Sequence, residues 1–401
     1  MPNNPTSKKS IHSYATLVLV VGMLVSGVCN TILNKFQDMQ CVRNCEDPDP
    51  KNRVYFEQPI WQTLNMFVGE FAVWSVYLYQ KYQQRKCRLE PAPPSAVNQL
   101  DASVIVDEVD QQITKTGQDL PELEGWKALL FWIPTLCDLA GTTVMNVGLL
   151  LISASVYQML RGAVVIFTGL FSYMFLNRRL RTYEWFSLVM VVFGVSIVGL
   201  SSVLFPQKKP DSVIFSTDSV DYKSLIGVTL VLGAQLFTAS QFVIEEKILV
   251  HYKVTPLKAV GLEGSFGLIS VLGAMPILHV ILGKHHDAFD IVQGYHDFFG
   301  NPTVWQTGLA ISCSIAFFNW FGLSITSTVS ATARSTIDAC RTLFIWMVSL
   351  YLGWEKFSWV QVVGFAVMVT GTFYFNGVFK WPFVTEEDEE GERERLLPRD
   401  E

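Results

Sequence analysis

Eight polar or ionisable side chains lie inside long apolar stretches of this chain, where they are placed to bind a solute or an ion. They are Glu70, Asp138, Gln158, Arg161, Glu263, Asn319, Asp338 and Arg341. A charged group in a hydrocarbon environment is costly, so such residues usually face a bundle interior or a wet cavity and mark a functional site. We therefore take these eight as the candidate binding residues.

Arg161 lies within residues 154–176, an apolar stretch that can cross a membrane. At about 1.5 Å per residue, about 20 helical residues span a hydrocarbon core of roughly 30 Å. A basic cluster follows at Arg178, Arg179 and Arg181. Because cytoplasmic loops carry an excess of Lys and Arg, the stretch is expected to be a membrane span that ends on the cytoplasmic side.

The composition of the whole chain favours a membrane protein. Half of the 401 residues are hydrophobic and 16% are charged, whereas soluble chains carry about 25% charge. Ten apolar runs lie at approximately 14–34, 59–79, 128–151, 154–176, 183–205, 225–248, 257–282, 305–327, 331–353 and 359–379. Since irregular backbone cannot be exposed to lipid, each run predicts a helix, and the expected fold is an all-α polytopic membrane protein with ten transmembrane helices.

The fourth and ninth runs repeat each other. A shift of 177 residues places Arg161 on Asp338, and the same shift places Gly194 on Gly371. An odd number of spans separates the copies, so the second copy is inserted upside down. Two inverted five-helix repeats are typical of secondary transporters, which bind substrate near the bilayer midplane where the repeats meet.

This repeat predicts the organisation of the chain. Residues 1–13 are expected to be a cytoplasmic N-terminus, and 14–205 the first five-helix repeat, with a cytoplasmic linker at 80–127. Residues 225–379 are expected to form the second repeat, and 380–401 a cytoplasmic acidic tail. The distribution of basic residues places both termini in the cytoplasm.

Several candidates have a structural alternative. Arg161 is either a cavity residue or the partner of Asp138 in a buried ion pair that packs the bundle. Asp338 and Arg341 are three residues apart on one helix, so they either neutralise each other or contact a ligand. The sequence leaves both alternatives open.

Two glutamates, Glu70 and Glu263, each lie beside a glycine in an apolar run. A membrane carboxylate is either protonated or functional, and we favour function for both. Glu245 and Glu246 stand beside Lys247 at the end of the sixth run, so we expect them to be solvated.

Charge counting suggests the type of solute. Four of the eight candidates are acids and two are bases, which leaves a surplus of two negative charges if all are ionised. A nucleotide sugar carries a diphosphate and is better served by a basic cavity. The count therefore favours a cationic or zwitterionic solute, with protons bound at Glu70 or Glu263 as the driving ion.

Two further motifs lie outside the apolar runs. Cys41 and Cys45 follow the first run and either form a disulfide in an oxidising lumen or stay as two free thiols. Near the C-terminus, Glu392 precedes Leu396 and Leu397 in the arrangement of a dileucine endosomal and lysosomal sorting signal. The alternative is a chance match in a Glu-rich tail.

Other classes of protein lack support in the sequence. No cysteine or histidine cluster has zinc-site spacing, and no P-loop, nucleophile elbow or dinucleotide fingerprint is present. We therefore expect no enzymatic activity, no metal and no cofactor. The chain also has no basic nucleic-acid patch.

Several motifs carry a resemblance to a known family. They are QMLRGAV at 158–164, IFTGLFS at 166–172, LCD at 136–138, SAS at 153–155, EEK at 245–247 and GWE at 353–355. Together with the repeat, they resemble the drug/metabolite transporter superfamily of EamA type and, within it, subfamily F of solute carrier family 35. There is also a distant similarity to the chloroquine resistance transporters of digestive vacuoles. The resemblance implies solute transport in a lysosomal or late endosomal membrane, with a Golgi or mitochondrial membrane as the alternative.

Three functions follow as hypotheses. The leading one is a secondary transporter of a small organic solute, working by alternating access in an endomembrane. The alternative is a nucleotide-sugar antiporter of the Golgi, and the second alternative is a non-transporting membrane scaffold. The expected partners are the solute, the lipid bilayer and a clathrin adaptor that binds the tail.

Overall fold

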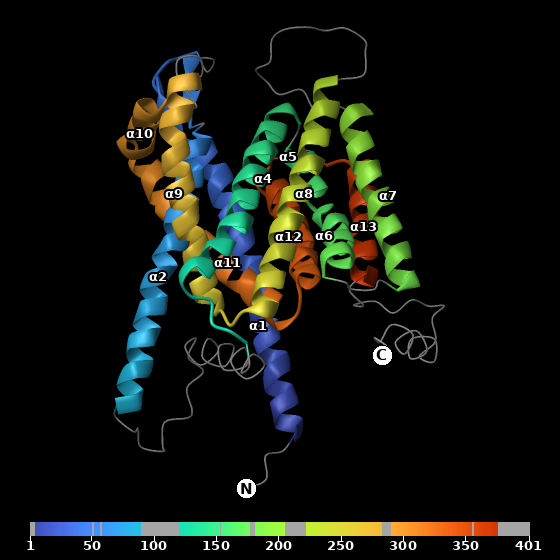
Figure 1. Cartoon of the computed structure of the whole chain (residues 1–401). Helices are drawn as coiled ribbons and strands as arrows, with labels where there is room; N and C mark the ends of the chain where they lie inside the picture. The colour runs from blue at the N-terminus through green and yellow to red at the C-terminus, as the bar shows by residue number, and fades with distance from the viewer. Residues whose placement is uncertain are drawn as a thin grey trace. The chain divides into compact units, whose positions relative to one another are not determined.

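The computed structural model is almost entirely helical (Figure 1). It describes residues 5–49, 52–56, 58–89, 120–152, 154–176, 181–204, 222–282, 290–354 and 357–375. The helices are α1 (Pro5–Asp38), α2 (Pro59–Leu89), η2 (Gly125–Phe131), α4 (Trp132–Leu151), α5 (Ala154–Arg161), α6 (Val164–Phe175), α7 (Thr182–Leu204), α8 (Tyr222–His251), α9 (Pro256–Leu282), α10 (Ile291–Gly300), α11 (Pro302–Thr328), α12 (Ala331–Tyr351) and α13 (Trp359–Phe375). Two short strands, β1 (Cys41–Arg43) and β2 (Val54–Tyr55), pair as an antiparallel hairpin.

Six helical segments in the described part of the chain are long and apolar enough to cross a membrane. They are Ala15–Asp38, Gly125–Leu149, Val156–Phe175, Ser224–His251, Pro256–Ile281 and Pro302–Thr328. Two shorter apolar helices, Thr182–Val198 and Trp359–Phe375, accompany them. These helices confirm the expected all-α polytopic membrane protein.

Helix α12 differs from these apolar helices because it carries three charged residues on one face. Arg334, Asp338 and Arg341 are spaced by four and three residues, and all three side chains are buried. Residues with this spacing lie above one another on a helix. The polarity of α12 is therefore directed into the protein, as expected for a helix that helps to form a site.

The fourth apolar run is a broken helix, whereas the sequence predicts a continuous one over 154–176. Helix α5 ends at Arg161, and α6 begins at Val164. The intervening turn is tightened, because the N–H groups of Gly162 and Ala163 bond to carbonyls only three residues earlier, at Met159 and Leu160. Helix α12, which lies 177 residues further along the chain, is continuous.

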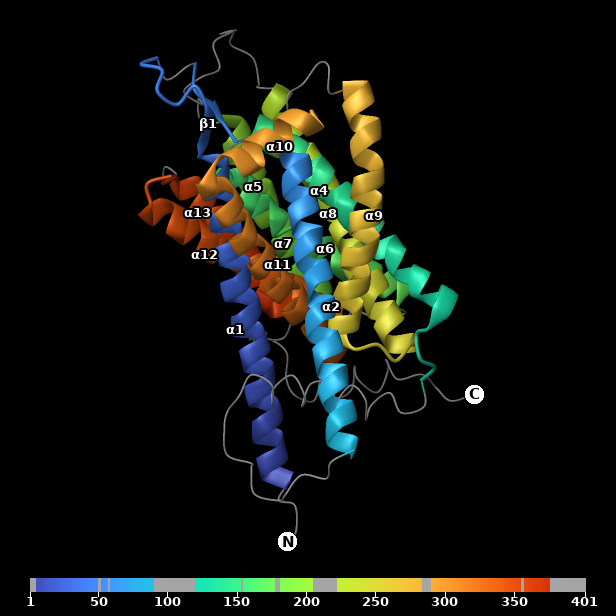
Figure 2. The same cartoon turned by 90° about the vertical axis from the view of Figure 1, so that its left-hand side faces the viewer.

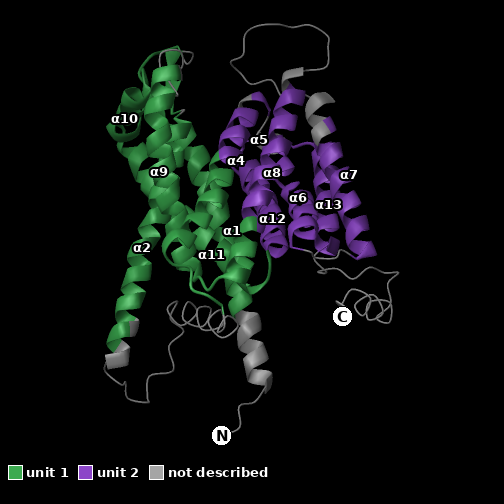
Figure 3. Ribbon diagram, in the orientation of Figure 1, with its two compact units in different colours: residues 1–139, 244–330 green, residues 140–243, 331–401 purple. Residues whose placement is uncertain are grey.

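The chain divides into two compact units (Figure 3). Unit 1 comprises residues 1–139 and 244–330, and unit 2 comprises residues 140–243 and 331–401. Helices α4 and α8 run across the divisions at 139/140 and 243/244. Each unit thus combines helices from both halves of the sequence.

In unit 1, α2 packs against both α9 and α11, and α1 packs against α11; Figure 2 shows α2 running beside α9. The contact between α2 and α9 is close at Gly264. A Cβ added there would collide with the backbone nitrogen of Phe71 and stand 2.6 Å from the carbonyl carbon of Glu70. Glycine at this position therefore allows the two backbones to approach.

In unit 2, α7 and α13 cross through two glycines in a reciprocal manner. A Cβ on Gly194 of α7 would stand 2.5 Å from the backbone nitrogen of Met368, and one on Gly371 of α13 would stand 3.0 Å from that of Val191. Adding 177 to the number of Gly194 gives Gly371, and subtracting 177 from the number of Met368 gives Val191. The shift therefore converts the first contact into the second. The two helices therefore run antiparallel and meet as equivalent surfaces.

Candidate functional site

In unit 1 the structure brings two of the predicted residues together. The side-chain amide of Asn319, on α11, donates a hydrogen bond of 2.5 Å to Oε1 of Glu70, on α2. Glu70 is 1% exposed, and Asn319 is also buried. Because the carboxamide is neutral, it can donate to an ionised carboxylate or to the carbonyl oxygen of a protonated one. The pair can therefore hold Glu70 in either state.

Glu263 lies on α9 and is 4% exposed. It precedes Gly264, where the backbone of α9 touches that of α2 at Glu70 and Phe71. The two predicted glutamates thus occupy the same crossing of α2 and α9. Asp138, on α4, is only partly buried.

Glu245 is a further acid of unit 1, and the expectation that it is solvated is wrong. The side chain is fully buried, whereas Glu246 is partly exposed and Lys247 is exposed. The reason is helical position. Ile248, three residues further along α8, is also buried, so Glu245 lies on the inward face of α8 although its neighbours in sequence are charged.

In unit 2 the predicted pair of Asp338 and Arg341 is formed. The guanidinium nitrogen Nη2 of Arg341 lies 2.7 Å from Oδ1 of Asp338, and both side chains are more than 90% buried. A buried ion pair of this kind contributes little net stability, but the loss of one member is strongly destabilising.

Arg161 is the last residue of α5, which packs against α12 in unit 2. Its side chain is half-buried, and the guanidinium carbon lies 6.0 Å from the centre of the Tyr157 ring. It also lies within electrostatic reach of Arg341. The neighbouring Gln158 is buried, and its Oε1 has no hydrogen-bond partner among the described residues.

The alternative in which Arg161 pairs with Asp138 joins a residue of unit 2 to one of unit 1. It stays a prediction, and a double variant that tests it is described below.

Arg334 is a buried charge that is missing from the sequence-based candidates. It is 1% exposed, and its guanidinium carbon lies 4.1 Å from the centre of the Phe242 ring, which makes a cation–π contact. Arg334 lies in the first turn of α12, and a basic residue at the end of a membrane helix is usually expected at the membrane–water interface. The spacing to Asp338 and Arg341, four and seven residues, is the signal that places it on the same inward face.

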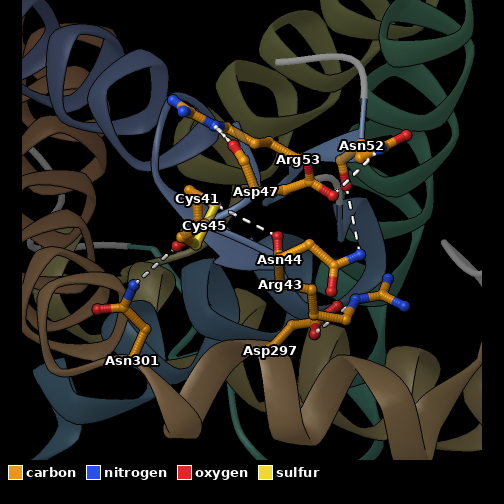
Figure 4. Close-up of a disulfide and its surroundings, with 9 residues drawn as sticks. All are labelled: Cys41, Arg43, Asn44, Cys45, Asp47, Asn52, Arg53, Asp297 and Asn301. Atoms are coloured by element: carbon orange, nitrogen blue, oxygen red, sulfur yellow. Dashed lines mark hydrogen bonds and ion pairs between the residues drawn. A yellow bond between two sulfur atoms is a disulfide. The ribbon is translucent and has the colours of Figure 1, made fainter. Parts of the chain in front are cut away.

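A second polar cluster lies in unit 1, around the β-hairpin (Figure 4). Cys41 and Cys45 form a disulfide, and Nε of Arg43, between them, lies 3.4 Å from the carboxylate of Asp297 on α10. The buried Asp297 also accepts hydrogen bonds from the side-chain amides of Gln58 and Gln293. The hairpin is thus held on α10 by a charged contact.

Other predictions fall on parts that carry no structural test. Glu392, Leu396 and Leu397 of the sorting signal lie outside the described residues, as do most of the linker and the whole acidic tail. Within the described ranges, no group of three or more His, Cys, Asp or Glu residues is arranged to hold a metal ion.

Comparisons with known proteins place the chain among transporters. A model of the nucleotide-sugar transporter family matches residues 105–333. Proteins described as solute carrier family 35 member F6 are 35% identical to this chain in Homo sapiens and 33% identical in Mus musculus; each alignment covers 94% of this chain and 94% of the relative. An uncharacterized protein of Schizosaccharomyces pombe is 34% identical over 91% of this chain and 99% of its own length.

One solved crystal structure shares the fold. It aligns with a TM-score of 0.52 at 10% sequence identity and covers 91% of this chain and 97% of the solved one. The likeness concerns the fold alone. The resemblance drawn from the motifs, to subfamily F of solute carrier family 35, is confirmed by the sequence relatives.

Proposed function

Because the chain belongs to the nucleotide-sugar transporter family and to solute carrier family 35, we propose that it is a secondary transporter that moves a small organic solute across an endomembrane. Transport proceeds by alternating access. Among the described residues, unit 1 contributes buried polar side chains from α2, α9 and α11, and unit 2 contributes them from α5 and α12.

The proposed architecture has ten spans in two inverted five-helix repeats. The reciprocal contact of α7 with α13 supports it, because antiparallel helices related by an internal two-fold axis meet through equivalent residues. Gly194 and Gly371 occupy such positions, 177 residues apart, as do Val191 and Met368. A two-fold axis perpendicular to the helices is the symmetry of an inverted repeat.

Protons bound at Glu70 are proposed to drive transport. The carboxyl group is buried against the neutral amide of Asn319, which accommodates both the protonated and the ionised form. Glu263, at the same crossing of α2 and α9, is a second proton site. The Glu70–Asn319 pair is the observation that carries this part of the proposal.

A cationic or zwitterionic solute is favoured on charge grounds. When the buried Glu245 and Arg334 are added to the predicted residues, the set holds five acids and three bases. The surplus of two negative charges is the same as in the sequence-based count. A proton or a positively charged part of the solute reduces this surplus.

Uptake into proteoliposomes tests the mechanism. We expect accumulation of a pool of labelled amino acids, dipeptides and amines to depend on a pH gradient in the native protein. Glu70→Gln keeps an oxygen that accepts from Asn319 but cannot release a proton, so it should abolish dependence on the gradient. Glu46→Gln, which changes an exposed loop carboxylate, is the matched control. Proton coupling would be contradicted if the rate of uptake were the same with and without a pH gradient in both the native protein and Glu70→Gln.

The second candidate is nucleotide-sugar antiport in the Golgi. It is favoured by the match of residues 105–333 to the nucleotide-sugar transporter family. An exchange assay tests it. Proteoliposomes loaded with a nucleoside monophosphate should take up an external nucleotide sugar, and empty proteoliposomes should not. Uptake of equal rate into empty liposomes would contradict antiport.

The proposed location is the lysosomal or late endosomal membrane, with both termini in the cytoplasm. The motif of Glu392, Leu396 and Leu397 is proposed to bind a clathrin adaptor. Leu396→Ala with Leu397→Ala should move a fluorescent fusion from lysosomes to the cell surface, whereas Pro398→Ala should not. An unchanged lysosomal distribution would show that the dileucine has no sorting role.

A further inference from the structure

Unit 2 places two guanidinium groups near each other at the break between α5 and α6. Arg161 ends α5, and Arg341 lies on α12, against which α5 packs. Like charges repel, and the repulsion is stronger away from water, so a negative group close to both would stabilise this arrangement.

The charges around Arg161 are only partly balanced. Asp338 is bound to Arg341 at 2.7 Å. Among the described residues of unit 2, no carboxylate forms an ion pair with Arg161. One acid and two bases leave one positive charge. The C-terminus of α5 contributes about half a negative charge at most, which leaves part of the guanidinium charge unbalanced.

The surroundings of Arg161 supply further hydrogen-bonding groups. The ring of Tyr157, one helical turn earlier, lies 6.0 Å from the guanidinium carbon, and its phenol is a donor. The side chain of Gln158 is buried, with an oxygen that is not hydrogen-bonded within the described part of the chain. Arg161 itself is half-buried, so its guanidinium is neither fully solvated nor sealed in the core.

The residue directly after Arg161 packs closely on α13. A Cβ on Gly162 would collide with the end of the fully buried Met368 side chain. A guanidinium presents a planar set of donors that matches the oxygens of a carboxylate or a phosphate.

We propose that Arg161, supported by Arg341, Tyr157 and Gln158, binds the anionic oxygens of the transported solute, a carboxylate or a phosphate group. This inference rests on the proposed transport function and excludes a plain amine as its solute. A zwitterion that carries a carboxylate agrees with the leading proposal, and an anion that carries a phosphate agrees with the second candidate, nucleotide-sugar antiport.

Ligand-induced thermal stabilisation of the purified full-length protein tests the proposal without requiring transport. The probes are alanyl-alanine, alanyl-alanine amide, inorganic phosphate and uridine monophosphate. We expect at least one probe with anionic oxygens to raise the melting temperature, and the amide to have no effect. A response to alanyl-alanine identifies a carboxylate as the ligand, and a response to either phosphate compound identifies a phosphate.

Variants connect the effect to the arginine. Arg161→Gln should weaken binding of the active probe about tenfold to a hundredfold, because charge-assisted hydrogen bonds are lost. Arg161→Lys, which keeps the charge but not the planar fork, should weaken it less. Lys247→Gln removes an exposed positive charge of α8 and should leave binding unchanged. Without a probe, Arg161→Gln should melt at or above the native temperature, because it relieves repulsion of Arg341.

Three outcomes would overturn the proposal. One is that none of the four probes stabilises the native protein. Another is that the active probe binds Arg161→Gln as tightly as the native chain. The third is that Arg161→Gln melts lower and that adding Asp138→Asn restores stability, which would make the arginine a structural partner of Asp138. If anions bind through Arg161 but no solute crosses the bilayer, the transport function fails while the binding site stands.

Discussion

The two units bury ionisable side chains of different sign. In unit 1 the fully buried ionisable residues among those described are Glu70, Glu245, Glu263 and Asp297, all acids. In unit 2 they are Glu184, Arg334, Asp338 and Arg341, and the half-buried Arg161 adds a third base. One unit thus concentrates carboxylates, and the other concentrates guanidiniums.

The partners of these groups differ as well. In unit 1, Glu70 is held by the neutral amide of Asn319, so its charge can change without breaking the contact. In unit 2, Asp338 is bound to Arg341, so loss of either charge removes a buried ion pair. The comparison teaches that unit 1 is suited to protonation, whereas unit 2 is suited to holding a fixed charge.

The largest expected effect comes from removing the acid of unit 2. Asp338→Ala removes the carboxylate that forms an ion pair with the buried Arg341 and should lower the free energy of unfolding by about 3–5 kcal/mol. The measurement is unfolding of the purified protein in detergent. The double variant Asp338→Leu with Arg341→Met, which removes both charges, should recover most of the loss. If Asp338→Ala were as stable as the native protein, unit 2 would not depend on its buried ion pair, and the proposed difference between the units would be wrong.

Glycine crossings should be equally sensitive in both units. Gly264→Ala in unit 1 and Gly194→Ala in unit 2 force a Cβ onto backbone atoms and should each cost about 1–3 kcal/mol. Gly273→Ala and Gly233→Ala place their Cβ in open space and should be neutral or stabilise by up to about 1 kcal/mol. Thermal melting of the four variants measures this; equal melting temperatures would refute the close crossings.

A smaller effect is expected from the hairpin of unit 1. Cys41→Ser with Cys45→Ser opens a short loop, which should cost up to about 2 kcal/mol. The loss should be confined to the hairpin, because Arg43 and Asp297 still attract each other. Hydrogen exchange should therefore increase at residues 41–55 and stay unchanged in α12. Increased exchange throughout both units would mean that the disulfide stabilises the whole chain.

The smallest effect should come from Glu70→Gln in unit 1. Glutamine has nearly the same shape and keeps an oxygen that accepts from Asn319, so stability should change by less than about 1 kcal/mol. Melting curves of this variant and of Asp338→Asn measure the difference between the units directly, because the loss of stability should be small in the first and large in the second. A loss in Glu70→Gln as large as that in Asp338→Asn would show that the acid of unit 1 also needs its charge to fold.

Local features of the protein could be predicted from the sequence. In the described part of the chain the apolar runs are helical over most of their length, because side-chain hydropathy and backbone hydrogen bonding within a segment decide this without knowledge of its neighbours. The proximity of Asp338 to Arg341 follows from a spacing of three residues on one helix. The 177-residue shift also relates Gly194 to Gly371, and both glycines lie at the crossing of α7 with α13.

Long-range contacts were decided only by the tertiary structure. Glu70 and Asn319 are 249 residues apart, and only the packing of α2 on α11 brings them together. The burial of Glu245 and Arg334 depends on which face of α8 and α12 turns inward, and the turn after Arg161 lies where Gly162 packs against Met368. The sequence by itself therefore determined the helices and the charges that they carry. Packing decided which of those charges are buried and which side chains they meet, because burial and contact are properties of neighbouring helices rather than of one segment.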